Sequence, residues 1–183
     1  MAISTSDFAK QYWGYYIVLE NDFRATTQYV TLHEDNFDTF SLEYIKLYQS
    51  ICSEIDVIAK NLCCFLSESF TGAKINSYYP VITSEFVGFI NRRINVLNKA
   101  ITLSPWKDWN PSKPPDWWTS YNKVKHQRTG IDKITKKPYY TTACLKNVLN
   151  ALAGLYQLEL YFYHRLALQE HKRVCVPIPA SMI

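Results

Sequence analysis

Residues 41–66 read SLEYIKLYQSICSEIDVIAKNLCCFL, and this stretch decides the fold. Its apolar residues recur at alternating spacings of three and four, which is the period of an α-helix packed lengthwise against a neighbour. The positions that follow this period are Ile45, Tyr48, Cys52, Ile55, Ala59, Leu62 and Leu66. Such a helix needs partner helices to cover its apolar stripe. The sequence therefore predicts a helical bundle.

Two further stretches supply those partners. Residues 6–29 form the first predicted helix, with Ser6 and Asp7 as its caps and a broad aromatic face. Residues 142–169 are apolar nearly all round, which predicts a central helix. The fold class is then all-α, an antiparallel helical bundle. Because 183 residues is the usual length of one domain, we assign residues 1–183 to a single domain.

An irregular insert, rich in Trp and Pro, is expected over residues 72–115. Its β-branched and aromatic residues favour a short β-hairpin built from Tyr78–Ile82 and Ile94–Ile101, although residues 86–97 also fit a helix. Four prolines within residues 103–115 exclude a helix interior. We expect an ordered loop there, held in place by its tryptophans.

Positive charge and tryptophan gather in the same part of the chain. The net charge of +4 is too small to indicate a nucleic-acid-binding protein by itself. Residues 104–140, however, hold 8 basic and 3 acidic side chains, and residues 130–138 read as an exposed basic turn. The same window contains four of the five tryptophans, Trp106, Trp109, Trp117 and Trp118. This mixture fits a groove for phosphates and bases, and it fits a protein interface equally well.

The most informative segment is DWWTSYNKVKHQRT at residues 116–129, which predicts a short helix starting after Pro115. Asn122 and His126 are four residues apart and therefore share one side of that helix. Three cations lie beside them: Lys123, Lys125 and Arg128. A histidine among cations suits a general acid or base that helps an RNA 2′-hydroxyl attack the adjacent phosphate. The alternative is a structural histidine, buried and bonded to a backbone carbonyl.

A narrow polar stripe runs along the third long helix at spacings of three and four. It consists of Asn147, Asn150, Gly154, Gln157, Tyr161 and His164. One interpretation is a solvated or close-packed stripe, and the other is a polar site lined by Asn147 and Asn150.

No pattern in the sequence indicates a cofactor or a metal. The five cysteines lack the spacing of a zinc site or a disulfide framework, so we expect free thiols in the core of a cytoplasmic protein. A Gly-rich phosphate loop and a nucleophile motif are also missing. No segment is apolar enough to predict a membrane span.

Three segments carry a resemblance to known proteins: SEIDVIAK at 53–60, WWTSYNKVKHQR at 117–128 and LKNVLNALAGLYQLELY at 145–161. The chain resembles a family of uncharacterised bacterial helical proteins and, more loosely, the HEPN superfamily of toxin–antitoxin and abortive-infection systems. The resemblance implies a HEPN-like homodimer, an antitoxin or other protein partner, and metal-independent endoribonuclease activity. The superfamily's motif is an Arg, a polar residue and then a His. Asn122 and His126 match it, Tyr121 stands where Arg is expected, and Glu54 or Asp56 matches an acidic residue on an earlier helix.

We therefore expect a bacterial defence or stress protein that binds RNA, with cleavage depending on a motif that Tyr121 makes degenerate. The expected catalytic residues are His126 as general acid or base, Asn122 to orient the substrate, Arg128 to bind phosphate and Glu54 to orient the histidine. The expected RNA-binding residues are Lys123, Lys125, Trp117, Trp118, Tyr121, Asn147 and Asn150. The alternative is a non-catalytic dimeric interaction protein whose basic, Trp-rich segment docks a protein partner.

Overall fold

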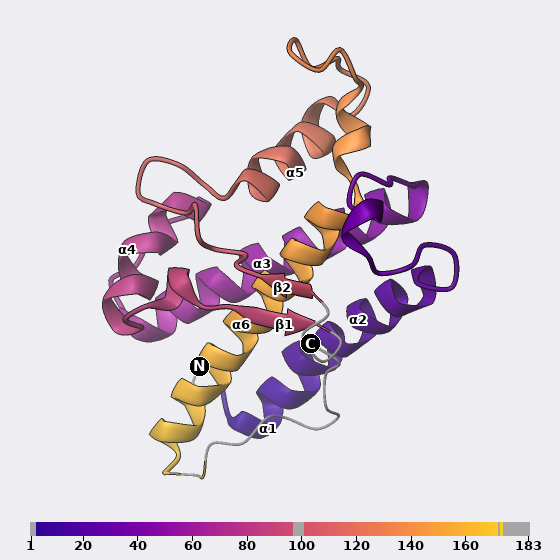
Figure 1. The fold of residues 1–183 in the computed structure, drawn as a ribbon. Coiled ribbons are helices and arrows are strands. Elements are labelled where there is room, and N and C mark those ends of the chain that lie inside the picture. The colour runs from indigo at the N-terminus through magenta and orange to yellow at the C-terminus, as the bar shows by residue number, and fades with distance from the viewer. Residues whose placement is uncertain (1–2, 97–100, 172, 174–183) are drawn as a thin grey trace.

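Two long helices, α3 (Leu42–Leu66) and α6 (Leu145–Gln169), pack along each other and form the centre of the fold. The structure is a computed structural model, and it describes residues 3–96, 101–171 and 173 (Figure 1). Helix α3 begins after Ser41, whose hydroxyl accepts a hydrogen bond of 3.0 Å from the Tyr44 amide. The stripe predicted from the spacing is buried along its length except at Leu66, which is partly exposed. The prediction of a mostly helical fold is confirmed.

Helices α3 and α6 run in the same direction. The Leu145 amide donates to the Thr39 carbonyl at 2.9 Å, which joins the starts of the two helices. Near their far ends, the rings of Phe65 and Phe162 lie 5.6 Å apart. The antiparallel arrangement is therefore wrong for this pair. It applies to helices joined by short connections, whereas residues 67–144 are long enough to return the chain to the end from which it started.

The N-terminal helix runs antiparallel to both. It comprises α1 (Thr5–Phe8), a π-helical segment η1 (Ala9–Trp13) and α2 (Gly14–Thr26), which continue one another. Phe8, at its start, packs on Phe162 near the end of α6. Phe23, near its end, packs on Tyr44 at the start of α3. This helix therefore supplies the aromatic face that the sequence predicted.

The cap of that helix differs from the prediction. Ser4 is the capping residue, and its hydroxyl oxygen accepts a hydrogen bond of 3.1 Å from the Asp7 amide. Ser6 and Asp7 instead lie in the first turn. A short 3₁₀ turn, η2 (Glu34–Asn36), then leads towards α3.

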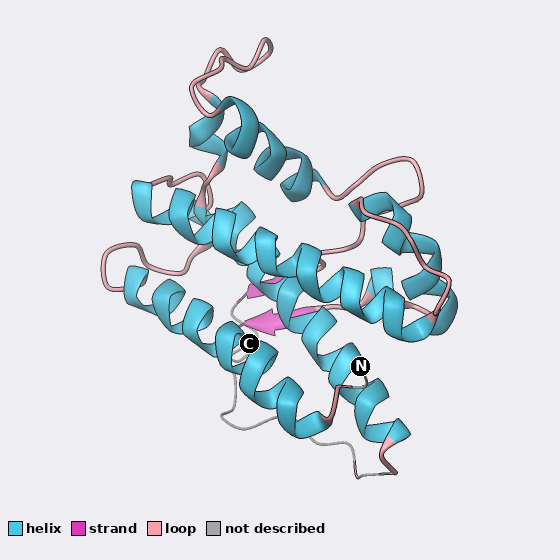
Figure 2. Ribbon diagram, turned by 180° about the vertical axis from the view of Figure 1, so that it is seen from behind, coloured by secondary structure: helices cyan, strands magenta, loops and turns pink. Residues whose placement is uncertain are grey.

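The insert is more regular than expected in its first part. Tyr78–Ile82, predicted as a strand, lies within helix α4 (Ile75–Glu85), and the 3₁₀ turn η3 (Phe89–Asn91) follows. The predicted pairing of Tyr78–Ile82 with Ile94–Ile101 is therefore wrong, although a short hairpin does form nearby, where β1 (Ile94–Val96) pairs antiparallel with β2 (Ile101–Leu103). Residues 97–100 lie outside the described part of the chain. The two strands lie on one face of the helices, in front of α6 in Figure 1 and behind the helices in Figure 2.

The insert packs onto the polar stripe of α6. Trp106 is fully buried, and its indole N–H donates to the Gly154 carbonyl at 3.3 Å. One turn further on, the Gln157 amide donates to the Phe89 carbonyl at 2.7 Å. The ring of Tyr161 then packs edge-on against Phe89, with centroids 5.1 Å apart. From Gly154 to Tyr161, the stripe is therefore a close-packed seam that receives the insert.

The remaining elements are α5 (Asp116–Gln127) and the 3₁₀ turn η4 (Tyr139–Thr142). Helix α5 begins directly after Pro115, as predicted. It lies across the top of the molecule in Figure 1, and the basic turn of residues 130–138 extends beyond it.

We predict that Gly154→Val lowers the free energy of unfolding by about 1–3 kcal/mol, because a core that is already filled tolerates added methyl groups poorly. A Cβ at Gly154 would already lie 3.3 Å from the Trp106 ring and 3.4 Å from the Trp117 ring. Asn150→Val on the same helix is the control, since the Asn150 side chain donates to the helix's own Lys146 carbonyl. Urea unfolding measures both variants. Equal stability would show that the insert does not pack tightly at Gly154.

Candidate functional site

Two hydrogen bonds of Trp117 fix helix α5 in place. The Trp117 indole N–H donates to the Pro105 carbonyl at 2.6 Å, and the hydroxyl of buried Tyr48 on α3 donates to the Trp117 carbonyl. The apolar side of α5 is buried against the bundle through Trp117, Trp118, Tyr121 and Val124. The opposite side is thereby turned outward. It carries the polar residues of the predicted motif.

Beside α5 lies a cleft of about 600 Å³, which we call the α5 cleft. Three helices form its walls: α5, α3 and the start of α4. Its polar lining residues are Ser53, Asp56, Lys74, Asn76, Asn122, Lys125 and His126. The structure thus brings the predicted pair Asn122 and His126 together with Lys125 in one open cleft. Lys74, which sequence reasoning missed, adds a second cation.

The cleft mixes two cations with one carboxyl group. Asp56 accepts a hydrogen bond of 3.0 Å from the Tyr78 hydroxyl. Burial, and then the charge of Asp56, raise the pKa of Tyr78, so this hydroxyl keeps its proton. The Lys125 ammonium lies 5.6 Å from the centre of the Tyr121 ring, in the range of a cation–π contact. Neither Lys74 nor Lys125 forms an ion pair with any residue that the structure describes.

A second, shallower hollow of about 390 Å³ lies on the other side of the motif. It is lined by Pro114, Thr119, Asn122, Lys123, His126 and Gln127. Asn122 and His126 are common to both hollows and stand between them. An extended chain crossing α5 from one hollow to the other would therefore pass over both side chains.

His126 is exposed, so the alternative of a buried structural histidine does not hold. It lies in the last turn of α5 with its side chain open to solvent on the cleft side. An exposed imidazole can exchange protons with water and with a bound substrate. This is the chemistry that a general acid or base requires.

The aromatic residues predicted to stack on RNA bases are largely buried. Trp117, Trp118 and Tyr121 are only 5%, 6% and 4% exposed, so their ring faces are not open to stack on bases, although Trp118 and Tyr121 contribute to the lining of the α5 cleft. Tyr121 packs edge-on against Tyr48, and its burial raises the pKa of its hydroxyl to about 12. These rings anchor α5 to the bundle.

Asn147 and Asn150 do not meet the motif either. The Asn147 amide donates to the Thr142 carbonyl at 2.8 Å, and the Asn150 amide donates to the Lys146 carbonyl at 2.8 Å. Both side chains therefore satisfy backbone near the start of α6. Neither lines the α5 cleft or the second hollow.

Glu54 lies on a different face of α3 from the cleft. Its charge acts instead on Tyr12 and on Glu159 of α6, and burial raises its pKa. Glu159 is fully buried, and neither of its oxygens has a hydrogen-bond partner among the residues described. Burial, and then the charge of Glu54, raise the pKa of Glu159 well above its usual range. The acidic residue in the cleft is Asp56, the other residue that the resemblance offered.

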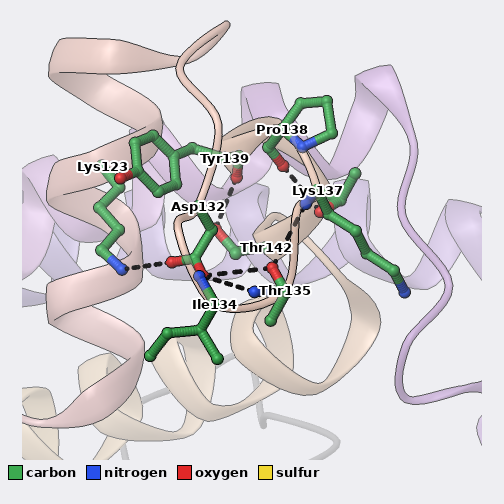
Figure 3. A network of polar contacts seen from close by, with 9 residues as sticks. Lys123, Asp132, Ile134, Thr135, Lys137, Pro138, Tyr139 and Thr142 are labelled. Atoms are coloured by element: carbon green, nitrogen blue, oxygen red, sulfur yellow. Dashed lines mark hydrogen bonds and ion pairs between the residues drawn. The ribbon is translucent and has the colours of Figure 1, made fainter.

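Arg128 and Lys123 do not line the α5 cleft. Arg128 is exposed at the C-terminal end of α5 and lines neither hollow. Lys123 forms an ion pair of 3.2 Å with Asp132 and lies 5.0 Å from the centre of the Tyr139 ring. Figure 3 shows this contact joining α5 to the loop beyond it. Asp132 is a structural residue that the sequence pattern did not single out.

Within the described part of the chain, no group of three or more His, Cys, Asp or Glu side chains is arranged to hold a metal ion. Cys52, Cys63 and Cys144 are buried free thiols as expected, whereas Cys64 is exposed and Cys175 lies outside the described residues. No described helix is long and apolar enough to cross a membrane.

Comparison with known proteins finds no match for this chain among family models, curated protein sequences or solved structures.

We predict that His126→Ala changes the free energy of unfolding by no more than about 0.5 kcal/mol, because the side chain is exposed. Val124→Ala, two residues away on the buried side of α5, should cost about 2 kcal/mol through lost burial and a cavity. Urea unfolding of both variants checks the pair. A loss at His126 as large as that at Val124 would contradict the exposed placement.

Proposed function

We propose that this chain binds single-stranded RNA across the α5 cleft and cleaves it with His126 as general acid and base. The observation that carries the proposal is the meeting of Asn122, Lys125 and His126 with Lys74 at one open cleft. Cations beside an exposed imidazole suit a phosphodiester substrate, because they attract the phosphate and stabilise the charge that develops on it.

The reaction follows from these groups. His126 removes the proton from a 2′-hydroxyl, whose oxygen attacks the adjacent phosphorus. The new bond joins phosphorus to the 2′-oxygen, and the bond to the 5′-oxygen breaks. His126 then returns the proton to the departing 5′-oxygen. The products are a 2′,3′-cyclic phosphate and a 5′-hydroxyl, and Lys125 offsets the added negative charge at phosphorus.

Asn122 supplies orientation in this scheme. It is four residues before His126 and lines the same two hollows, so its amide can hold a phosphate or a ribose hydroxyl next to the imidazole. Asp56, which accepts a hydrogen bond from the Tyr78 hydroxyl, is the acidic residue of the cleft, and we assign it the role of orienting the His126 imidazole. In the proposal it takes the part that the HEPN resemblance gives to Glu54 or Asp56.

Docking of a protein partner through the tryptophans has less support. Trp106, Trp109, Trp117 and Trp118 are all buried in the chain itself, so they present very little indole surface to a partner. The side chains that the basic segment exposes are mainly charged. Exposed cations suit binding to a polyanion better than they suit the core of a protein interface. The homodimer and antitoxin of the HEPN resemblance remain parts of the proposal.

We predict that Lys125→Glu weakens binding of a single-stranded RNA of about 12 nucleotides by about tenfold at low salt. The dependence of log affinity on log salt should become shallower by about 0.7 for each phosphate that the variant no longer neutralises. Lys10→Glu makes the same charge change on an exposed side chain outside the cleft and should alter the affinity less than about twofold. Fluorescence anisotropy measures both. Equal losses of affinity would mean that net charge, rather than the cleft, controls binding.

We predict that His126→Ala lowers the rate of RNA cleavage by about 10²–10⁴-fold while leaving RNA affinity within a few-fold of the original. Cleavage by the unaltered chain should persist in EDTA and should yield cyclic-phosphate ends. Gel analysis of end-labelled RNA measures rate and product. Cleavage that survives His126→Ala would remove the histidine from the mechanism.

A further inference from the structure

Beyond α5 the chain forms a projecting loop, residues 129–138, which we call the finger. In Figure 1 the finger stands away from the helices at the end of α5. Its two sides are joined near the base, where Ile131 and Pro138 form an antiparallel bridge and the Asp132 amide donates to the Lys137 carbonyl at 2.9 Å. The finger is thus a narrow, two-sided projection.

A network centred on Asp132 holds the finger in one shape (Figure 3). One oxygen of Asp132 accepts hydrogen bonds from the amides of Ile134 and Thr135, at 3.0 and 2.9 Å. The other oxygen receives the Lys123 ammonium of α5 at 3.2 Å. The Thr135 amide and then Lys123 lower the pKa of Asp132 to about 2, so these bonds are present at neutral pH. The loop is therefore ordered before any partner arrives.

The finger exposes three lysine side chains and the apolar side chain of Ile134. Lys133, Lys136 and Lys137 are exposed and form no ion pair with any described residue. Ile134 is 91% exposed at the tip. Lys136 has φ = 58°, a left-handed conformation in which Gly or Asn is favoured over lysine. The chain therefore carries a lysine at a position where backbone geometry alone would favour another residue.

We propose that the finger grips a double-stranded stem of the same RNA whose single-stranded part lies in the α5 cleft. This inference rests on the proposed function and narrows the substrate class to RNA with a stem next to an unpaired segment. Arg128 lies at the base of the finger and only two residues after His126, so cations continue from the cleft to the tip.

The shape and chemistry of the finger fit an RNA stem. The minor groove of an RNA helix is wide and shallow, and it has a phosphate backbone on each side. A narrow projection with lysines around its tip can place one cation towards each backbone, while Ile134 contacts the sugars and base edges between them. A single unpaired strand would offer only one row of phosphates and would leave Ile134 in water.

The test compares two RNAs on the full chain by fluorescence anisotropy. One is a single strand of about 12 nucleotides, and the other is the same strand joined to a stem of about 10 base pairs. The unaltered chain should prefer the stem-containing RNA by about tenfold or more. Lys133→Glu, Lys136→Glu and Lys137→Glu combined should remove that preference. Lys10→Glu, Lys60→Glu and Lys107→Glu combined make an equal charge change at exposed sites outside the finger and should keep it.

Asp132→Ala separates the shape of the finger from its charge. It leaves every lysine in place and makes the chain more positive, so non-specific attraction alone would strengthen binding to the stem. If a preformed finger is needed, the preference for the stem should instead fall by about threefold or more, with single-strand affinity nearly unchanged. A circular dichroism spectrum like that of the unaltered chain confirms that the helices are intact.

The outcomes keep the two proposals apart. If the chain binds the single strand but shows no preference for the stem, or if the finger variant keeps the preference, the finger inference is overturned while the cleft proposal stands. Competition by polyglutamate as strong as that by the stem would assign the finger to acidic protein surfaces and would also overturn it. If the unaltered chain binds neither RNA at low salt, the proposed function itself fails.

Discussion

The approach of two tryptophan rings to Gly154 positions most of the candidate site. Trp106 and Trp117 both meet α6 where it lacks a side chain, and Trp117 also bonds to the Pro105 carbonyl. Because Trp117 is in the first turn of α5, the seam on α6 fixes the insert and α5 together. The cleft and the finger both follow from where α5 is placed. An aromatic contact inside the core thus determines which polar groups face outward.

The sequence was most informative where one residue pattern had one physical outcome. The spacing in α3 predicted a helix with a buried stripe, and Pro115 predicted the start of α5. The pattern failed for α4, because its β-branched and aromatic residues suggest a strand, whereas packing against α3 favours a helix. The parallel course of α3 and α6 was also missed, since periodicity reveals which face is buried but not which way a distant helix runs.

The candidate site was predictable only in part, for the same reason. Spacing alone placed Asn122 and His126 on one side of α5, and both line the cleft. It did not reveal that the neighbouring rings face inward, so composition alone made the tryptophans look like RNA contacts. The choice between Glu54 and Asp56 was equally out of reach. These two residues are two positions apart and point about 200° apart on the helix, and the spacing does not reveal which direction faces α5. Lys74 reaches the cleft from the residue just before α4, and no local pattern connects it to the motif.

Glu159 gives the bundle a pH-dependent stability that is unrelated to the candidate site. Its raised pKa means that the folded chain keeps a proton that the unfolded chain gives up above an ordinary carboxyl pKa of 4.5. Between that pH and the raised value, unfolding releases this proton, so the contribution of Glu159 to stability declines as the pH rises. Nearby Glu54 strengthens the effect whenever it is ionised. Folding therefore creates a proton-binding site at Glu159 that is stronger than the same carboxyl in the unfolded chain. Mild acid keeps this site protonated and so favours the folded state.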